Sequence, residues 1–180
     1  MEITIEITNF CENECDYCSS NATPLNAKYI DYEDVISFLK CITEKIDRIN
    51  ISGGEPLAHP QFYKILRACE MRCKDVWVYT NALKQIRFNA SVIPEVNVEA
   101  NVCLIPGRKV YLPKKVNKIH LLQLVKQGRA EDNELIPGSY HVSSNISGGS
   151  ECDCSECKHK FLLQADGKIV QTPCKKSYED

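Results

Sequence analysis

Polar and apolar residues alternate along the first segment of the chain, residues 2–8, which reads EITIEIT. Such an alternation, rich in β-branched residues, predicts a strand with one buried face. Two further strands are predicted at residues 48–52 and 75–81. Apolar residues at helical spacing predict helices over residues 31–46 and 60–73. The order strand, helix, strand, helix, strand is typical of a parallel sheet with crossover helices.

The pattern changes after residue 82. Strands are predicted at residues 84–88, 97–105 and 118–125, but the gaps between them contain prolines and little room for helices. A complete strand-helix-strand unit needs about 30 residues. We therefore predict an α/β protein with a partial parallel β/α barrel that is open and abbreviated.

From residue 127 onward the composition shifts toward Gly, Ser, Asn and Cys. We predict a barrel core over residues 1–128 and a small Cys-rich C-terminal extension over residues 129–180, rather than a second independent domain. Within this extension, Asp166 and Gly167 lie between two apolar runs and predict a hairpin turn.

The bulk properties exclude few function classes. The chain has 180 residues, 43% of them hydrophobic and 26% charged, which is typical of a globular domain of ordinary size. A formal net charge of −2 gives no reason to expect a nucleic-acid partner. No apolar run approaches the ~20 residues of a membrane span. The first ten residues resemble neither a secretory signal nor a transit peptide, so we expect a cytoplasmic protein without a membrane partner.

Eleven cysteines are unusual for a chain without an export signal. In a reducing cytoplasm, cysteines serve more often as metal ligands than as disulfide partners. Cys41, Cys69, Cys73 and Cys103 lie in helical or apolar stretches, and we expect ordinary thiols at these positions.

Three unusual loops follow the first three predicted strands. Cys11, Cys15 and Cys18 come after the first strand, SGGEP (52–56) after the second and YTNA (79–82) after the third. The carboxyl ends of parallel strands share one edge of a sheet, and this edge carries the chemistry in α/β proteins. We therefore expect the three loops to converge.

Three thiolates with C-x3-C-x2-C spacing suit a metal centre with an open position. A [4Fe–4S] cluster normally takes four cysteines, so three leave one iron available to a substrate or cofactor. The alternative is a zinc site with a fourth ligand elsewhere, such as His59.

The sequence CENECDYC, followed downstream by SGGEPL, resembles the radical S-adenosylmethionine (radical SAM) superfamily. The three-cysteine spacing matches the signature of that family, with an aromatic residue, Tyr17, before the last cysteine. The resemblance extends over roughly residues 1–130. It implies a [4Fe–4S] cluster on Cys11, Cys15 and Cys18, with S-adenosylmethionine chelating the remaining iron.

The glycine-rich motif consists of Gly53, Gly54, Glu55 and Pro56. The resemblance implies that this turn holds the amino group of S-adenosylmethionine through backbone carbonyls and the Glu55 carboxylate. Glycine allows such a close approach because it has no Cβ.

Other cofactor contacts are carried over one residue at a time. Tyr17 would lie beside the adenine, and Thr80 and Asn81 stand where family members often place polar contacts. Ala82 replaces the glycine commonly found there. Independently of the resemblance, the bidentate guanidinium of Arg129 suits pairing with the cofactor carboxylate, and simple surface exposure is the alternative.

The activity implied by the resemblance is reductive cleavage of S-adenosylmethionine. An electron, delivered by a reductant such as flavodoxin or ferredoxin, would split a carbon–sulfur bond. The resulting 5′-deoxyadenosyl radical would take a hydrogen atom from the substrate. The cofactors carry this chemistry, while the protein orients them and excludes water.

A second cysteine group lies in the extension: Cys152, Cys154, Cys157 and Cys174, spaced C-x-C-x2-C-x16-C. It resembles a shortened form of the SPASM/twitch extensions that carry an auxiliary cluster in many radical SAM enzymes. The first interpretation is therefore a second [4Fe–4S] cluster. A structural zinc ion and unliganded or redox-active thiols are the alternatives.

The open barrel leaves room for a large substrate, so we expect an enzyme that modifies a peptide or protein. Within the enzyme class, a small metabolite or nucleoside-like substrate is the alternative. Two other classes stay open: an activase that installs a glycyl radical on a partner enzyme, and a non-catalytic iron–sulfur or zinc module that transfers electrons. Simple electron carriers have no need of the GGEP motif, which counts against the last class.

Overall fold

The computed structural model describes residues 1–18, 20–81, 99–104, 118–123, 146–147 and 160–170. These residues fall into two compact units. The first contains the described residues 1–14, 20–81 and 160–170, and the second contains 15–18, 99–104, 118–123 and 146–147.

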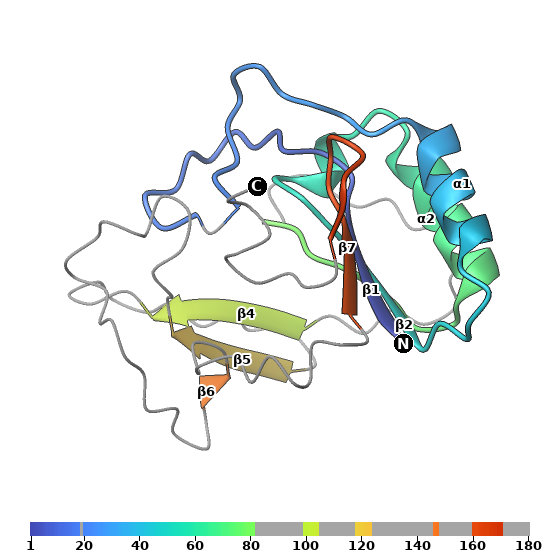
Figure 1. The fold of residues 1–180 in the computed structure, drawn as a ribbon. Helices are drawn as coiled ribbons and strands as arrows, with labels where there is room; N and C mark the ends of the chain where they lie inside the picture. The colour runs from blue at the N-terminus through green and yellow to red at the C-terminus, as the bar shows by residue number, and fades with distance from the viewer. Residues whose placement is uncertain (19, 82–98, 105–117, 124–145, 148–159, 171–180) are drawn as a thin grey trace. The chain divides into compact units, whose positions relative to one another are not determined.

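The first unit is built on a five-stranded sheet with the strand order β3-β2-β1-β7-β8 (Figure 1). β1 pairs in parallel with both β2 and β7, and β2 pairs in parallel with β3, whereas β7 and β8 are antiparallel. The strands are β1 Glu2–Glu6, β2 Arg48–Ser52, β3 Val76–Val78, β7 Lys160–Leu163 and β8 Ile169–Val170. The α/β class predicted from the sequence is confirmed.

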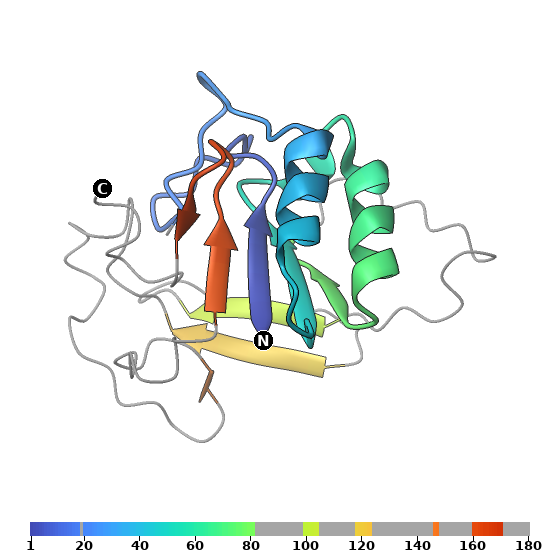
Figure 2. The same cartoon turned by 45° about the vertical axis from the view of Figure 1, so that its right-hand side comes forward.

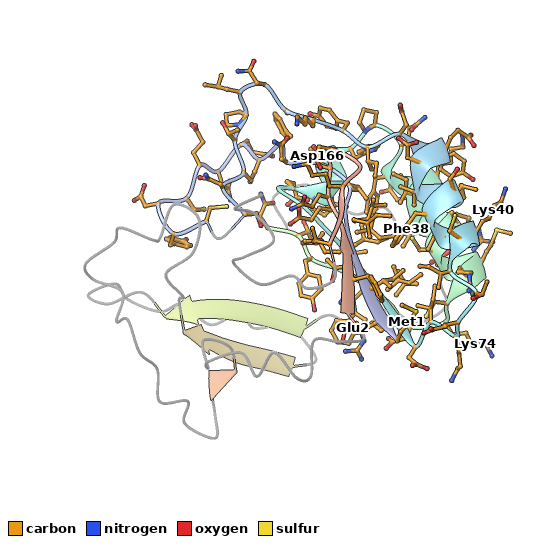
Figure 3. The ribbon with its side chains drawn as sticks, viewed as in Figure 1. Met1, Glu2, Phe38, Lys40, Lys74 and Asp166 are labelled. Atoms are coloured by element: carbon orange, nitrogen blue, oxygen red, sulfur yellow. The ribbon has the colours of Figure 1, made fainter. Side chains whose placement is uncertain are left out.

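Helices α1 (Tyr32–Cys41) and α2 (Phe62–Arg72) lie side by side on one face of this sheet (Figures 1 and 2). Under them, the alternating isoleucines of β1 and β2 form a fully buried core. Phe38 is buried, whereas Lys40 and Lys74 extend away from the sheet (Figure 3). The strand alternation thus gives one apolar face for the helices and one polar face opposite.

Helix α1 is shorter than the predicted helix over residues 31–46. At its C-terminus, Ile42 already has an extended backbone. The Arg72 guanidinium of α2 donates hydrogen bonds to the carbonyl oxygens of Ile42, at 2.8 Å, and Glu44, at 3.1 Å. Ile46, which fits the helical spacing, is buried from the following loop. A buried apolar residue therefore extended the periodicity beyond the real end of the helix.

The elements around the glycine-rich motif differ slightly from prediction. A short 3₁₀ helix, Pro56–Ala58, precedes α2, which begins two residues later than expected. β3 ends at Val78 rather than at residue 81. The Tyr79 amide still donates to the Ile51 carbonyl at 3.0 Å, and the chain then turns toward Glu55. Because Thr80 and Asn81 donate hydrogen bonds to Glu55, the strand ends earlier than predicted.

The predicted hairpin turn at Asp166 and Gly167 is confirmed. β7 and β8 flank it, Gly167 has φ +84°, and its amide donates to the Gln164 carbonyl at 2.9 Å. No pattern in the sequence indicated that β7 pairs with β1, aligning Ile3 with Phe161. The hairpin is therefore part of the main sheet.

The second unit contains a three-stranded parallel sheet of order β4-β5-β6. β4 (Glu99–Leu104) and β5 (Lys118–Gln123) confirm the strands predicted at 97–105 and 118–125, and β6 (Ile146–Ser147) was not predicted. The strand predicted at 84–88 lies outside the described residues. The boundary at residue 128 stays a prediction. In the part of the chain that the structure describes, no helix combines the length and apolar character needed to span a membrane.

Candidate functional site

The glycine turn after β2 is pressed against the backbone that follows β1. The Gly54 amide donates to the Thr8 carbonyl at 2.7 Å, and the Glu55 amide donates to the Phe10 carbonyl at 2.6 Å. Gly53 has φ +138°, and a Cβ there would collide with the Thr8 carbonyl oxygen. A Cβ at Gly54 would collide with the carbonyl oxygen of Phe10. Both positions therefore require glycine, and the turn is fixed to the chain that leads into the cysteine loop.

Glu55 is completely buried, and its carboxylate accepts hydrogen bonds from two loops. Oε1 accepts from the Leu57 amide at 2.9 Å and from the Thr80 hydroxyl at 2.8 Å. Oε2 accepts from the Asn81 amide at 2.8 Å. The structure thus brings together two of the loops that were expected to converge, those after β2 and β3.

Thr8 holds the start of the cysteine loop and was not singled out from the sequence. It is fully buried; its hydroxyl donates to the Lys28 carbonyl at 2.7 Å and accepts from the Phe10 amide at 3.0 Å. Asn9 Oδ1 accepts from the Lys28 amide at 2.6 Å. The available signal was a pair of short polar residues between a strand and a cysteine motif, since such residues often bond to nearby backbone.

His59 is a structural residue rather than a metal ligand. It is 5% exposed, Nδ1 accepts from the Gln61 amide at 3.0 Å, and Nε2 lies 2.9 Å from the Ile30 carbonyl oxygen. The acceptor role of Nδ1 assigns the proton to Nε2, which donates to Ile30. Burial lowers the pKa of His59. Because both ring nitrogens make hydrogen bonds within the protein, His59 is not available as the fourth ligand of the alternative zinc site.

The cysteine loop shows a consistent pattern of exposure. Cys11, Cys15, Cys18 and Tyr17 are partly exposed. The polar residues among them are exposed: Glu12, Asn13, Glu14 and Asp16. Cys11 belongs to the first unit, and its amide donates to the Thr23 carbonyl at 3.3 Å. Cys15 and Cys18 belong to the second unit and are joined by a turn, with the Cys18 amide 3.1 Å from the Cys15 carbonyl.

Within the described residues, no three Cys, His, Asp or Glu side chains lie close enough to hold a metal ion. The cluster ligands therefore stay a prediction that rests on donor chemistry. Three thiols of partial exposure suit iron, and the partly exposed glycine turn beside the start of their loop suits a cofactor bound next to the cluster. These residues fit the predicted cofactors.

Several predicted site residues fall outside the described residues. They are Ala82, Arg129, Cys152, Cys154, Cys157 and Cys174. Their roles stay predictions.

Three cysteines expected to be ordinary thiols show the burial expected of such residues. Cys41 is exposed at the end of α1, and Cys69 and Cys73 are buried. Burial raises the pKa of Cys69 to about 12, so this thiol stays protonated at neutral pH and is unreactive. The side chain of Cys103 lies outside the described residues.

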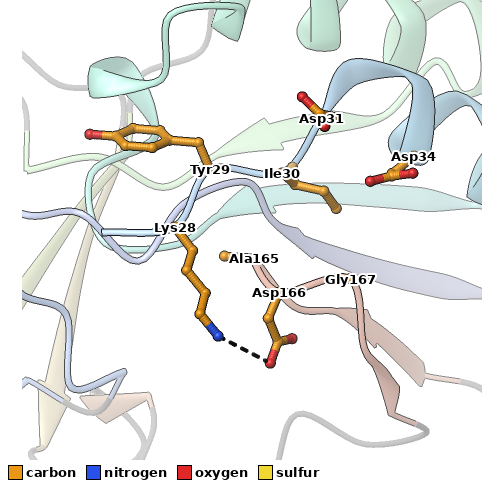
Figure 4. Close-up of a pocket in the computed structure, with 8 residues that line it drawn as sticks. All are labelled: Lys28, Tyr29, Ile30, Asp31, Asp34, Ala165, Asp166 and Gly167. Carbon is orange, nitrogen blue, oxygen red and sulfur yellow. Dashed lines mark ion pairs between the residues drawn. The ribbon is translucent and has the colours of Figure 1, made fainter. Parts of the chain in front are cut away.

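A hollow of about 370 Å³ lies between the segment before α1 and the β7–β8 turn (Figure 4). Asp31, Asp34 and Asp166 line it, and Lys28 Nζ points at Asp166, 3.9 Å from its carboxylate. Because none of the predicted site residues lines this hollow, it is separate from the glycine turn.

Comparison with protein families gives one clear match. The model of the Radical SAM superfamily matches residues 5–108, which include the cysteine loop, the glycine turn and the loop after β3. This match covers more than half of the chain.

Curated relatives match over shorter stretches. A probable GTP 3′,8-cyclase of Methanocella arvoryzae is 36% identical over 80 residues, which cover 44% of this chain and 26% of that protein. The GTP 3′,8-cyclase of Helicobacter pylori is 40% identical over 60 residues, which cover 31% of this chain and 18% of that protein. The chain thus matches about a quarter or less of the length of these relatives.

Solved structures resemble the chain over nearly its whole length. SuiB of Streptococcus suis, bound to the precursor peptide SuiA, matches with a TM-score of 0.64 and 14% identity over 94% of this chain and 58% of SuiB. BtrN in complex with AdoMet and 2-DOIA matches with a TM-score of 0.52 and 15% identity over 98% of this chain and 74% of BtrN. At these identities the likeness shows the fold alone.

The fold comparison and the family match agree with the observed sheets. The mostly parallel open sheet is the partial β/α barrel that the sequence predicted. The chain belongs to the radical SAM superfamily of enzymes, whose cofactors are a [4Fe–4S] cluster and S-adenosylmethionine.

Proposed function

We propose that this chain reductively cleaves S-adenosylmethionine and abstracts a hydrogen atom from a peptide or protein substrate. The observation that carries the proposal is the glycine turn, Gly53 to Glu55, fixed by two backbone hydrogen bonds to the chain that leads into the cysteine loop. When bound, the reduced cluster and S-adenosylmethionine supply the radical that removes the hydrogen atom.

The residues of the chain bind and orient these cofactors. Cys11, Cys15 and Cys18 would hold the cluster as thiolates. The partly exposed backbone of Gly53 and Gly54 would receive the amino group of S-adenosylmethionine, as the family resemblance implies.

The remaining cofactor contacts are assigned by the family motif. Tyr17 would pack beside the adenine, and Thr80 and Asn81 would supply polar contacts. Arg129, proposed for its bidentate guanidinium and not by the motif, would pair with the carboxylate. Pro56, which is buried, would set the direction in which the chain leaves the turn.

Two observations bear on the substrate. The likeness to SuiB, whose structure holds a precursor peptide, supports a peptide or protein substrate. The sequence identity to GTP 3′,8-cyclases over part of the chain supports the second candidate, a nucleotide or other small metabolite. We favour the peptide because the open barrel predicted from the sequence leaves room for a large substrate.

Two further parts of the proposal rest on the sequence. Cys152, Cys154, Cys157 and Cys174 would hold a second [4Fe–4S] cluster, with zinc as the alternative. A reductant such as flavodoxin or ferredoxin would supply electrons in the cytoplasm, where thiols stay reduced.

The test is anaerobic reconstitution with iron and sulfide, followed by dithionite and S-adenosylmethionine. We expect 5′-deoxyadenosine from the wild type and none from Cys15→Ala. Cys41→Ala is the matched control, because Cys41 is exposed on α1 and has no expected role. Equal product from Cys15→Ala and wild type would overturn the proposal.

The substrate is tested separately with GTP and with a pool of synthetic peptides. A mass loss of one or two hydrogens, or a new cross-link, in a peptide supports the peptide assignment. Conversion of GTP with unchanged peptides would replace it with the nucleotide assignment.

A further inference from the structure

The Glu55 carboxylate lies in the glycine-rich motif, but its surroundings do not suit a group that touches a ligand. The side chain is 0% exposed, while the neighbouring Gly53 and Gly54 are partly exposed. The turn therefore offers its glycine backbone to a ligand and keeps the carboxylate inside.

Three protein donors already satisfy this carboxylate. The Leu57 amide and Thr80 hydroxyl donate to Oε1, and the Asn81 amide donates to Oε2. A buried charge is tolerated only when it is neutralised or well hydrogen-bonded, and bonds to a charged acceptor are short and strong. The distances of 2.8 to 2.9 Å agree with this.

The donors come from two loops that are distant in the sequence. Leu57 follows the glycine turn. Thr80 and Asn81 lie 25 and 26 residues after Glu55, in the loop that follows β3. The two loops extend from neighbouring parallel strands. One carboxylate thus fixes the position of the loop after β3 relative to the glycine turn.

We propose that Glu55 is a positioning residue that shapes the S-adenosylmethionine site by holding Thr80 and Asn81 beside the glycine turn, without touching the cofactor. The inference rests on the proposed function, because it concerns the same cofactor site. It differs from the assignment that the family resemblance implies, in which the carboxylate itself contacts the amino group.

The two roles make different predictions for a double-mutant cycle. Glu55→Gln places an amide NH₂ opposite N–H or O–H donors, and Thr80→Val removes one of these donors. If Glu55 acts through Thr80, the effects of the two substitutions overlap. If Glu55 contacts the cofactor directly, the two losses multiply.

The experiment measures S-adenosylmethionine binding by calorimetry on the reconstituted chain with the cluster oxidised, so that no turnover occurs. We expect Glu55→Gln to weaken binding about 10- to 100-fold, as the loss of a buried hydrogen-bond partner does. The double variant should bind within about twofold of Glu55→Gln alone. Thr80→Ser, which keeps the hydroxyl, should restore the affinity that Thr80→Val loses. The matched control is Glu70→Gln, and this variant should bind S-adenosylmethionine like wild type. Glu70 forms an ion pair with Arg67 on α2.

A second readout needs neither cofactor binding nor a stable Glu55→Gln protein. The Asn81 amide should be protected from hydrogen exchange in wild type without S-adenosylmethionine, since Glu55 accepts its proton in the free protein. Multiplied losses in the double variant, or rapid exchange at Asn81, would overturn the inference. A wild type that does not bind S-adenosylmethionine would instead overturn the proposed function, while Asn81 protection would still report the connection between the loops.

Discussion

Single residues decide how closely the chain can fold around the proposed cofactor site. Gly53 and Gly54 are required by the carbonyl groups of Thr8 and Phe10, whose oxygens occupy the space that a Cβ would take. The motif letters GGEP could therefore be recognised from the sequence, but the reason for each glycine could not. That reason depends on a contact with a segment more than 40 residues earlier, which no local pattern encodes.

Two glycines with positive φ provide a matched pair of substitutions. Gly53→Ala combines backbone strain with a collision, whereas Gly167→Ala at φ +84° meets no atom within 4 Å and suffers strain alone. We expect Gly167→Ala to lower the free energy of unfolding by about 1–2 kcal/mol. Gly53→Ala should lower it by a further ~1–3 kcal/mol through overpacking. Urea denaturation measures both, and equal losses would contradict the collision.

His59 makes stability depend on pH in a defined direction. Its folded-state pKa is lowered mainly by burial, so the unfolded chain binds the proton more readily. The free energy of unfolding is therefore unaffected by His59 above its unfolded pKa of about 6.5 and falls as the pH drops below this value, through the folded pKa.

This pH dependence is measured as the difference between wild type and His59→Gln in urea denaturation from pH 7.5 to pH 5. The glutamine side chain of the variant does not titrate, so we expect wild type to lose more stability than the variant on acidification. The other three histidines contribute equally to both proteins and cancel. A parallel decline of the two proteins would show that the ring is not buried in its neutral form.

At the scale of elements, prediction succeeded where a single alternating pattern determined the whole strand. β1 and β2 alternate cleanly and were found within two residues of their observed ends. α1 was predicted too long because buried Ile46 continues the helical spacing from a loop. β3 was predicted too long because its last polar residues bond to Glu55 instead of continuing the sheet. In both cases a tertiary contact ended the element.

The hairpin of β7 and β8 should contribute to stability through β7. Leu162 is 1% exposed, and Leu162→Ala should lower the free energy of unfolding by about 2–5 kcal/mol, the usual range for a buried leucine. Ile169 on β8 is 57% exposed, so Ile169→Ala should change it by no more than ~0.5 kcal/mol. Chemical denaturation compares the two, and similar losses would mean that β7 is not packed on the sheet.

At the scale of the whole molecule, the sequence predicted the fold class and the family, but only some of the segments that become neighbours. The convergence of the loops after β2 and β3 followed from strand order. The pairing of β7 with β1 did not, because register between distant strands depends on packing that alternation alone leaves open.

The Cys-rich extension makes a prediction about metal content. If Cys152, Cys154 and Cys157 hold a second cluster, the reconstituted wild type should contain about eight irons, and a variant with all three changed to Ala about four. Iron and sulfide assays, with zinc measured in parallel, give the counts. Equal iron in both proteins would remove the second cluster, and zinc lost only from the variant would identify a zinc site.

The parallel pairing of β1 with β7 also affects the order of assembly. Ile3 aligns with Phe161, so one side of the first strand stays open until the ribosome has made β7. Contacts between segments so far apart slow folding, since a long loop must close first. The strand that leads into the three-cysteine loop therefore gains its second neighbour only after β7 is made, and stable insertion of iron should follow the synthesis of β7 rather than precede it.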